Sequence, residues 1–376
     1  MSPLKKIRVP LLLVLVALAI YWWRSHPAEK TAQPVGSSGV PSKTAVASVP
    51  AADPILPVFG SLGNNPAGSD SLSTLKDLQA KLKAMPAGEA VSWIRSFLAN
   101  GTDKSTGLAF EIGTGGTLTG WPTFRTFLID TLLAIDPQAA AEMSRQILGA
   151  PTTADEWALA LRNVGKADTS TESNAYLREK AEALIANPEW QANPSVGYLN
   201  AFDVLVHTNS TESTPLLSSL IQRKDRRDLA HAGFLTLDRL VERQPVDVLT
   251  RLAADQDLQQ SRPEMTAQEF ARADLRDPAQ QAIVKSWLLD PARTGTELHS
   301  FAGVYPNNNR FISNNLLTTG TTPTGSDLAA HDREVLEIIN TWQADPAFQP
   351  VLEHLRAVSS RLESFVVPGT SDHSSE

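Results

Sequence analysis

Proline residues preceded by a capping side chain recur along most of this chain and constrain its fold more than any other sequence feature. The dipeptides are Asp136-Pro137, Asn187-Pro188, Asp277-Pro278, Asp290-Pro291 and Asp345-Pro346. An Asp or Asn side chain accepts hydrogen bonds from the free N–H groups at a helix start, and proline has no N–H to leave unpaired there. Each dipeptide therefore predicts the first residue of a helix.

Apolar residues recur every three or four positions between these marks, which is the spacing of amphipathic helices. The last such stripe is the most regular, because Val351, Leu355, Val358, Leu362 and Phe365 step by four, three, four and three. The pattern predicts helices over residues 72–85, 91–98, 122–135, 137–148, 154–164, 173–186, 195–206, 212–222, 228–243, 246–254, 267–275, 279–289, 328–343 and 348–365.

The predicted fold class is all-α, with a helical domain over residues 71–365. Short links between such helices place successive helices antiparallel, and the near absence of strand signals argues against an α/β enzyme fold. The intervals between the capped prolines are unequal, so no named helical repeat is indicated. We expect an irregular α/α superhelix with HEAT-like solenoid character and one short β-hairpin insertion. A compact helical bundle is the alternative.

The N-terminal region carries an uninterrupted apolar run, Val9–Trp23, which follows Lys5, Lys6 and Arg8. The run ends in bulky aromatic residues, which suit a membrane–water interface, and no small-residue cleavage site follows it. We therefore predict a single transmembrane helix, an uncleaved signal anchor, at residues 9–24.

This anchor would orient the chain. Basic residues precede the apolar run, so residues 1–8 are expected in the cytoplasm and the body in the periplasm or another extracytoplasmic space, with the anchor in the cell inner membrane. Fifteen helical residues span only about 22 Å, less than the roughly 30 Å hydrocarbon core. A cleaved signal peptide is therefore the alternative.

Residues 25–70 are rich in Pro, Ser, Ala and Gly and predict a disordered linker, because such a segment buries too little apolar surface to offset its chain entropy. The tail at residues 366–376 is predicted to be disordered as well. Within the linker, the apolar stretch Ile55–Leu62 predicts a strand or arm laid on the protein's own surface, with a docking motif for another protein as the alternative.

Charge and cysteine content exclude several classes of function. The net charge is −8, and the first 24 residues carry four basic residues and no acid, which leaves −12 for the rest. Such a body repels nucleic-acid phosphates, so no nucleic-acid partner is expected. The chain has no cysteine, which rules out disulfides, thiolate metal sites and a cysteine nucleophile.

One segment that breaks the helical pattern is Leu108–Trp121, which reads as a β-hairpin with a glycine-rich turn. Such a turn before a helix can present backbone N–H groups to a phosphate or carboxylate. An anion held by Gly115, Gly116 and Thr117, with Arg125 in the following helix, is the functional hypothesis. A structural hairpin that covers a helix pair is the simpler interpretation.

The other irregular segment is Tyr305–Asn315, which contains five asparagines. Asparagine favours turns and bonds to its own backbone, so a well-connected loop is the simpler interpretation. The functional hypothesis is a polar ligand site in which amide and aromatic groups contact a sugar. The candidate contacts are Tyr305, Asn307, Asn308, Asn309 and Phe311.

No motif predicts a catalytic residue, a metal site or a cofactor. None of the histidines stands in a metal-ligating spacing, and no nucleophile-elbow motif G-x-S-x-G occurs. His231, in an apolar helix, is predicted to be a hydrogen-bonded core histidine. The acidic pairs Asp155-Glu156 and Glu334/Glu337 are interpreted as solvated helix faces.

These observations favour a non-catalytic scaffold or protein-interaction module of the cell envelope, with a protein partner at the membrane surface. The alternative is an envelope protein that binds or cleaves polysaccharide, with dispersed carboxylates and the asparagine-rich loop as its site. Two carboxylates of a glycosidase need not be close in sequence, so the sequence leaves this alternative open.

Overall fold

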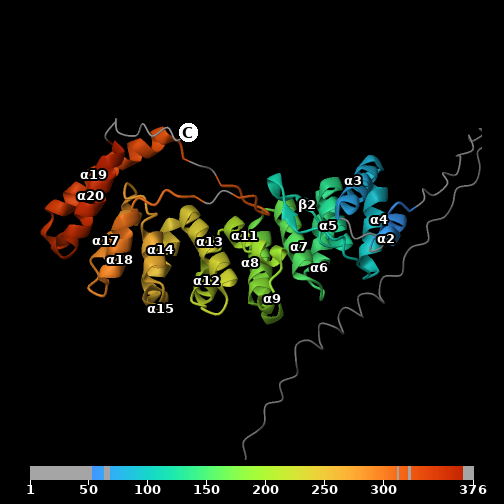
Figure 1. The fold of residues 1–376 in the computed structure, drawn as a ribbon, viewed down its shortest axis with the longest axis horizontal. Coiled ribbons are helices and arrows are strands. Elements are labelled where there is room, and N and C mark those ends of the chain that lie inside the picture. The colour runs from blue at the N-terminus through green and yellow to red at the C-terminus, as the bar shows by residue number, and fades with distance from the viewer. Residues whose placement is uncertain (1–52, 63–67, 311–312, 321–322, 367–376) are drawn as a thin grey trace, which may run out of the picture. The chain divides into compact units, whose positions relative to one another are not determined.

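The computed structural model describes residues 53–62, 68–310, 313–320 and 323–366, and these residues are mostly helical (Figure 1). The predicted membrane anchor at 9–24, the tail from residue 367 and the candidate contact Phe311 lie outside the described residues. No helix in the described ranges combines the length and the apolar character needed to cross a bilayer.

The first half of the described chain contains helices of different lengths and one small sheet. The helices are α2 (Ile55–Ser61), α3 (Gly68–Ala84), α4 (Ala87–Ala99), α5 (Phe124–Ile135), α6 (Pro137–Ile147), α7 (Ala154–Ala167), α8 (Thr171–Ala186), α9 (Pro188–Ala192), α10 (Val196–Asn200) and α11 (Asp203–His207). The strands are β1 (Glu111–Ile112) and β2 (Leu118–Gly120), joined by the 3₁₀ turn Thr114–Gly116.

The second half is helical, with one long irregular connection. Its helices are α12 (Thr214–Ile221), α13 (Arg227–Arg243), α14 (Pro245–Ala254), α15 (Gln256–Ser261), α16 (Pro263–Phe270), α17 (Pro278–Leu288), α18 (Gly295–Val304), α19 (Gly325–Ala344) and α20 (Leu352–Val366). Further 3₁₀ turns precede α12 (Thr211–Ser213) and α20 (Pro346–Val351).

Capping side chains start the helices as the sequence predicts at four of the five capped prolines. The Asp136 carboxylate accepts from the Ala139 N–H at 3.0 Å, and Asn187, Asp277 and Asp345 bond their following N–H groups in the same way. Asp290-Pro291 is the exception, because it forms a turn and α18 starts later, after the cap Thr294.

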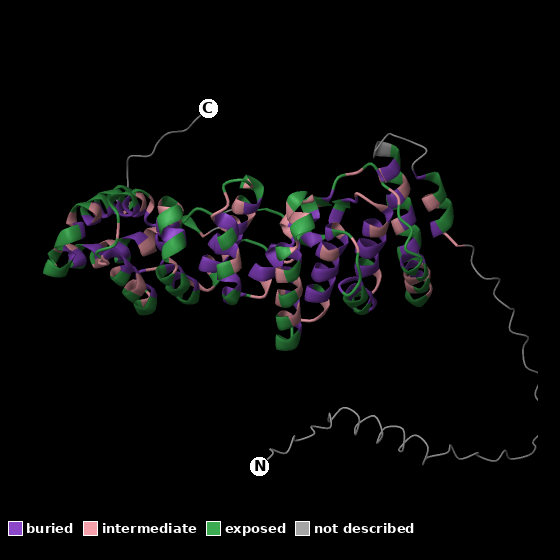
Figure 2. Cartoon of the chain, turned by 90° about the horizontal axis from the view of Figure 1, so that it is seen from below, coloured by how far each residue is buried: buried purple, intermediate pink, exposed green. Residues whose placement is uncertain are grey.

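Most helices pack against a helix that is near in chain order, and the helices stand side by side in a row (Figure 1). Contacts join α5 to α6, α6 to α7, α12 to α13, α16 to α18 and α19 to α20. Buried residues lie between the helices of the row, and exposed ones lie along its outer faces (Figure 2). The core is therefore continuous along the row of described helices.

The predicted hairpin is confirmed as an antiparallel pair, with Glu111 opposite Gly120 and Ile112 opposite Leu118. Its turn requires glycine, because Gly115 and Gly116 have φ of +70° and +76°, in the left-handed region. The mostly helical fold with one small sheet matches the predicted class at this level.

Residues 55–61 correct one prediction, because they form the helix α2 rather than a strand. Ile55 is fully buried, and the Phe59 ring contacts Phe97 with 4.9 Å between ring centroids. Folded structure therefore begins inside the segment that composition assigns to a linker, because apolar residues at helical spacing find partners in α3 and α4.

Two further sequence interpretations are wrong. His231 is exposed, because the buried stripe of α13 includes Leu229 and Gly233 and leaves His231 on the opposite face. Glu156 is buried rather than solvated, because Arg125 pairs with it at 2.9 Å. Asp155 accepts from the Ser195 hydroxyl at 2.6 Å, and burial raises its pKa.

An extended connection leaves α18, runs back along the helices to the hairpin, and returns to α19 (Figure 1). We call its residues 306–310 and 313–320 the strap. The Asn307 N–H donates to the Ala271 carbonyl at 2.9 Å, and farther on the Asn314 amide donates to the Ile112 carbonyl at 3.2 Å. The strap therefore crosses the row from α16 to β1.

Candidate functional site

Three arginine–aspartate pairs connect helices along the edge of the row where the strap lies. They are Arg162 with Asp130, Arg239 with Asp203, and Arg272 with Asp238. The partners lie 32, 36 and 34 residues apart in the sequence. Each arginine thus reaches back to an acid on a preceding helix, and each also contacts irregular chain that lies on this edge.

The first pair is buried and holds the hairpin. Arg162 donates to Asp130 at 2.6 Å and to the Gly116 carbonyl at 2.8 Å. Its other nitrogens donate to the Asn163 side chain, and Asp130 accepts from the Trp121 indole at 2.8 Å. Every charged atom of the pair therefore has partners, as a buried ion pair requires.

The second pair binds the strap through its main chain. The Asp203 carboxylate accepts from the Leu317 N–H at 2.7 Å and from the Thr318 N–H at 3.0 Å. The Thr318 hydroxyl donates to Asp203, and Arg239 contacts both groups. One buried carboxylate thus recognises two successive backbone N–H groups and one hydroxyl.

The third pair binds the start of the strap. Arg272 donates to Asp238, to Glu242 at 3.2 Å and to the Asn309 carbonyl at 2.7 Å. Glu269 lies 4.0 Å from the same guanidinium, and its two oxygens have no hydrogen-bond partner among the described residues. One arginine therefore faces three carboxylates in a largely buried place.

Burial and mutual repulsion shift the titration of these acids. Desolvation raises the pKa of Asp238 to about 6, against the pull of Arg272. Desolvation also raises the pKa of Glu269 well above its usual value, and the Asp238 charge adds to this effect. Glu269 therefore favours its protonated form in the folded protein.

Replacing Glu269 by Gln should change the pH dependence of stability. The folded-state pKa of Glu269 is raised, so the contribution of this group to wild-type stability falls as pH rises above the unfolded value of about 4.5. Gln carries no titrating proton, so the difference in melting temperature, variant minus wild type, should increase from pH 5 to pH 8. Thermal unfolding at the two pH values measures this difference.

Glu264→Gln, on the exposed face of the same helix, is the control for the loss of one negative charge. The difference in melting temperature between this variant and wild type should be similar at both pH values. Equal pH dependence of the two variants would contradict a raised pKa at Glu269.

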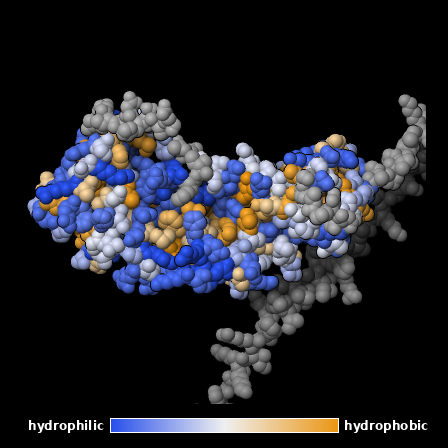
Figure 3. All heavy atoms as spheres, in the orientation of Figure 1, coloured by the Kyte–Doolittle hydropathy of each residue, from blue (hydrophilic) through white to orange (hydrophobic). Residues whose placement is uncertain are grey.

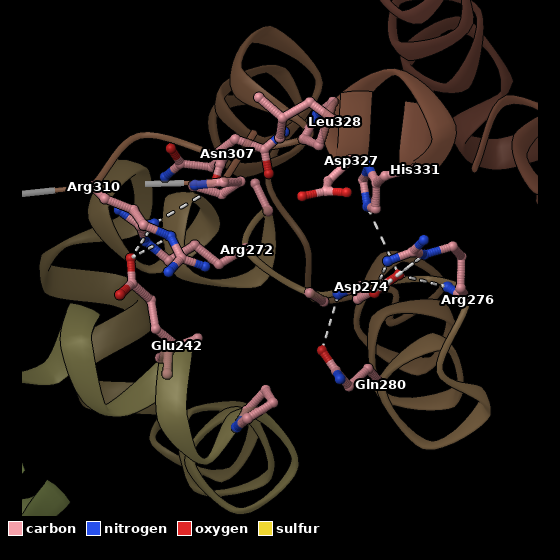
Figure 4. Close-up of a pocket in the computed structure, with 17 residues that line it drawn as sticks. Glu242, Arg272, Asp274, Arg276, Gln280, Asn307, Arg310, Asp327, Leu328 and His331 are labelled. Carbon is pink, nitrogen blue, oxygen red and sulfur yellow. Dashed lines mark hydrogen bonds and ion pairs between the residues drawn. The ribbon is translucent and has the colours of Figure 1, made fainter. Parts of the chain in front are cut away.

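A pocket of about 260 Å³ opens beside the third pair (Figure 4). Arg272 and Glu242 lie on one side of it, and Asp274 with Arg276 lies on another, where their charged groups are 2.7 Å apart. His331, from α19, lies 3.7 Å from Asp274. Because these charges already pair with one another, a ligand here would have to displace existing ion pairs.

The residues of the predicted anion site at the hairpin turn contact other parts of the chain. The Gly115 carbonyl accepts from Lys166 at 2.6 Å, so the turn presents carbonyl oxygens to cations. The Thr117 hydroxyl donates to the Thr114 carbonyl, and Arg125 is paired with Glu156 in α7. These contacts agree with the structural interpretation of the hairpin.

The asparagine-rich segment is divided between buried and exposed positions. Tyr305 is fully buried and stacks on Phe301 with 5.0 Å between ring centroids, so it offers no surface platform for a sugar. Asn307 and Asn309 hold the strap through main-chain groups, and exposed Asn308 lines the pocket. Here too the structural interpretation fits the contacts.

Sequence reasoning missed Asp203, Arg239 and Thr318, which form a connected polar group under the strap. The available signal was an Asp followed by an Arg after 32 to 36 residues, three times along the chain. Comparison of the chain with protein-family models, curated proteins and solved structures finds no match.

Proposed function

We propose that this protein is a non-catalytic, membrane-anchored helical scaffold whose extracytoplasmic body is an irregular α/α superhelix with HEAT-like solenoid character. The observation that carries the proposal is the polar edge of the helix row. Its three arginine–aspartate pairs all hold segments of irregular chain, through carbonyl, N–H and hydroxyl groups. An edge with this chemistry suits the binding of extended polypeptide.

Surface composition supports a polar mode of binding. Among the described residues, the well-exposed large apolar side chains are Leu56, Val196, Val246 and Phe365, which come from different helices. On the face drawn in Figure 3, hydrophobic residues lie in groups among hydrophilic ones. The partner would therefore be recognised by hydrogen bonds and charge at the edge, without a large apolar patch.

Tethering is the second part of the proposal. The basic, apolar and aromatic order of residues 1–24 favours an anchor, and α2 begins only at Ile55. About thirty residues of Pro- and Ser-rich chain between them would let the body reach a partner at the membrane surface or in the envelope. The polysaccharide alternative has less support, because Tyr305 is buried.

Crosslinking in cells that express the full chain tests this function. After carbonate washing of membranes, the chain should stay in the membrane fraction, and one protein should be recovered with it at near-equal amounts. A control chain that lacks residues 1–24 but carries a cleavable export signal should no longer be found in the membrane fraction. Release of the full chain by carbonate, or recovery of wall polysaccharide in place of a protein, would contradict the proposal.

A further inference from the structure

The strap is much longer than the connection it makes. Most connections between helices in a packed domain have about 2 to 8 residues, whereas twenty residues separate the end of α18 from the start of α19. Val304 and Gly325, at the two ends, line the same cavity, so a short link would have joined them. Long connections of this kind are uncommon and are usually either functional or linker segments.

The strap is seated by one short segment, Leu316–Thr318. Leu316 is fully buried, and its carbonyl lies so close to Gly116 that any side chain there would collide with it. Leu317 lies over Gly165, where an added Cβ would be 2.9 Å from the Leu317 side chain. Gly116 therefore leaves room for the Leu316 backbone and Gly165 for the Leu317 side chain, and Asp203 binds the N–H groups of Leu317 and Thr318.

Residues on both sides of this segment are exposed. Asn308–Arg310 and Ser313–Asn314 precede it, and Thr319 and Gly320 follow it. The central seat therefore depends on a few hydrogen bonds and two leucines, while α11 beneath it also contacts α7, α8 and α13 directly. Detachment of the segment would expose the Asp203 site without dismantling the row.

We propose that the surface formed by Asp203, Arg239, Gly116 and Gly165 is a docking site for an extended segment of a partner protein, and that the strap occupies it in the absence of this partner. The partner segment has two successive leucine-like residues followed by Thr or Ser. Asp203 recognises the backbone N–H groups and the hydroxyl, Gly116 leaves room for the backbone of the segment, and Gly165 accepts its second apolar side chain. This inference rests on the proposed scaffold function and names the chemistry of its partner.

Competition with the strap sets the affinity of the site. A segment tethered in the same chain acts at an effective concentration of order mM, so a free peptide with identical contacts competes poorly. Only molecules whose strap is detached can bind the peptide, so the apparent affinity equals the intrinsic affinity multiplied by the fraction of such molecules. Weakening the strap alone should therefore strengthen binding of an added peptide.

The test uses the whole chain and a labelled peptide, Ser-Asn-Asn-Leu-Leu-Thr-Thr-Gly, which copies residues 313–320. Leu316→Asp should detach the strap, because its seat would bury an unpaired charge. Fluorescence anisotropy should show at least tenfold tighter peptide binding than to wild type. Thr319→Ala, which alters an exposed neighbour, should bind like wild type.

A second change identifies the site. Asp203→Asn in the Leu316→Asp background should remove peptide binding, because an amide cannot accept the same set of N–H and hydroxyl donors. A scrambled peptide should not bind either variant. Binding that survives Asp203→Asn would overturn the inference.

A milder variant covers the case in which Leu316→Asp fails to fold. Thr318→Ala removes only the hydroxyl, and it should bind the peptide more tightly than Thr319→Ala does. If Leu316→Asp or Thr318→Ala folds but does not bind the peptide, the inference is overturned. It is also overturned if either variant dimerises by exchanging straps, because the occupant would then be a second copy. A crosslinked partner without peptide binding overturns this inference alone and leaves the scaffold function standing.

Discussion

Replacing Arg162 by Met is expected to lower the free energy of unfolding by about 3–5 kcal/mol, the typical cost of breaking a buried ion pair. Arg162 is fully buried, and it bonds Asp130, the Gly116 carbonyl and Asn163. The substitution leaves the Asp130 charge buried without its cation and removes the donor that holds the hairpin turn. Urea unfolding followed by circular dichroism measures the change.

Arg145→Met is the matched control. Arg145 pairs with Asp168 at 3.0 Å on the surface, where both side chains are more than a third exposed. Exposed pairs contribute about 0–1 kcal/mol, so the control should lose little stability. Similar losses for the two variants would mean that the buried pair has no special role in holding α5, α7 and the hairpin together.

Replacing Gly116 by Ala is expected to cost about 2–5 kcal/mol and to loosen the strap. A left-handed φ of +76° costs a side chain about 1–2 kcal/mol, and the new Cβ would also collide with the Leu316 carbonyl. The strap must shift to relieve the collision. Hydrogen exchange at the Leu317 and Thr318 amides, which Asp203 now binds, should accelerate by at least tenfold.

Gly115→Ala separates backbone strain from collision. Its φ is +70°, nearly the same, but an added Cβ would meet no atom within 4 Å. This variant should lose only the stability that corresponds to the backbone strain. Hydrogen exchange at the Leu317 and Thr318 amides should stay unchanged. If both alanine variants exchange alike at these amides, the contact between the hairpin and the strap does not hold the strap in place.

Local patterns predicted most of the helices and the hairpin, because these elements depend on neighbours a few residues apart. Asp136 caps α6 and the glycine turn closes the hairpin, and both features are visible in short windows. Helix α18 was missed although Leu298, Phe301 and Ala302 stand at helical spacing within it. Its capping box, Thr294 with Glu297, was nevertheless readable in the sequence.

The candidate site could not be predicted in the same way, because its partners are distant in sequence. Asp203 meets Thr318 across 115 residues, and no helical or strand period connects them. Glu156 looked like a solvated acid because its cation, Arg125, comes from another helix. Burial of charged groups depends on which helices become neighbours, and the periodicity of a single helix does not contain that information.

The strap also couples its own length to the size of the helix row beneath it. An open row of helix pairs can gain or lose a pair with changes only at the junction. Here the strap must span from Ala271 to Asp203 and reach the hairpin at Ile112, so one more pair between these points would move the anchors apart. Insertions and deletions in the row should therefore occur only together with compensating changes in the length of the strap.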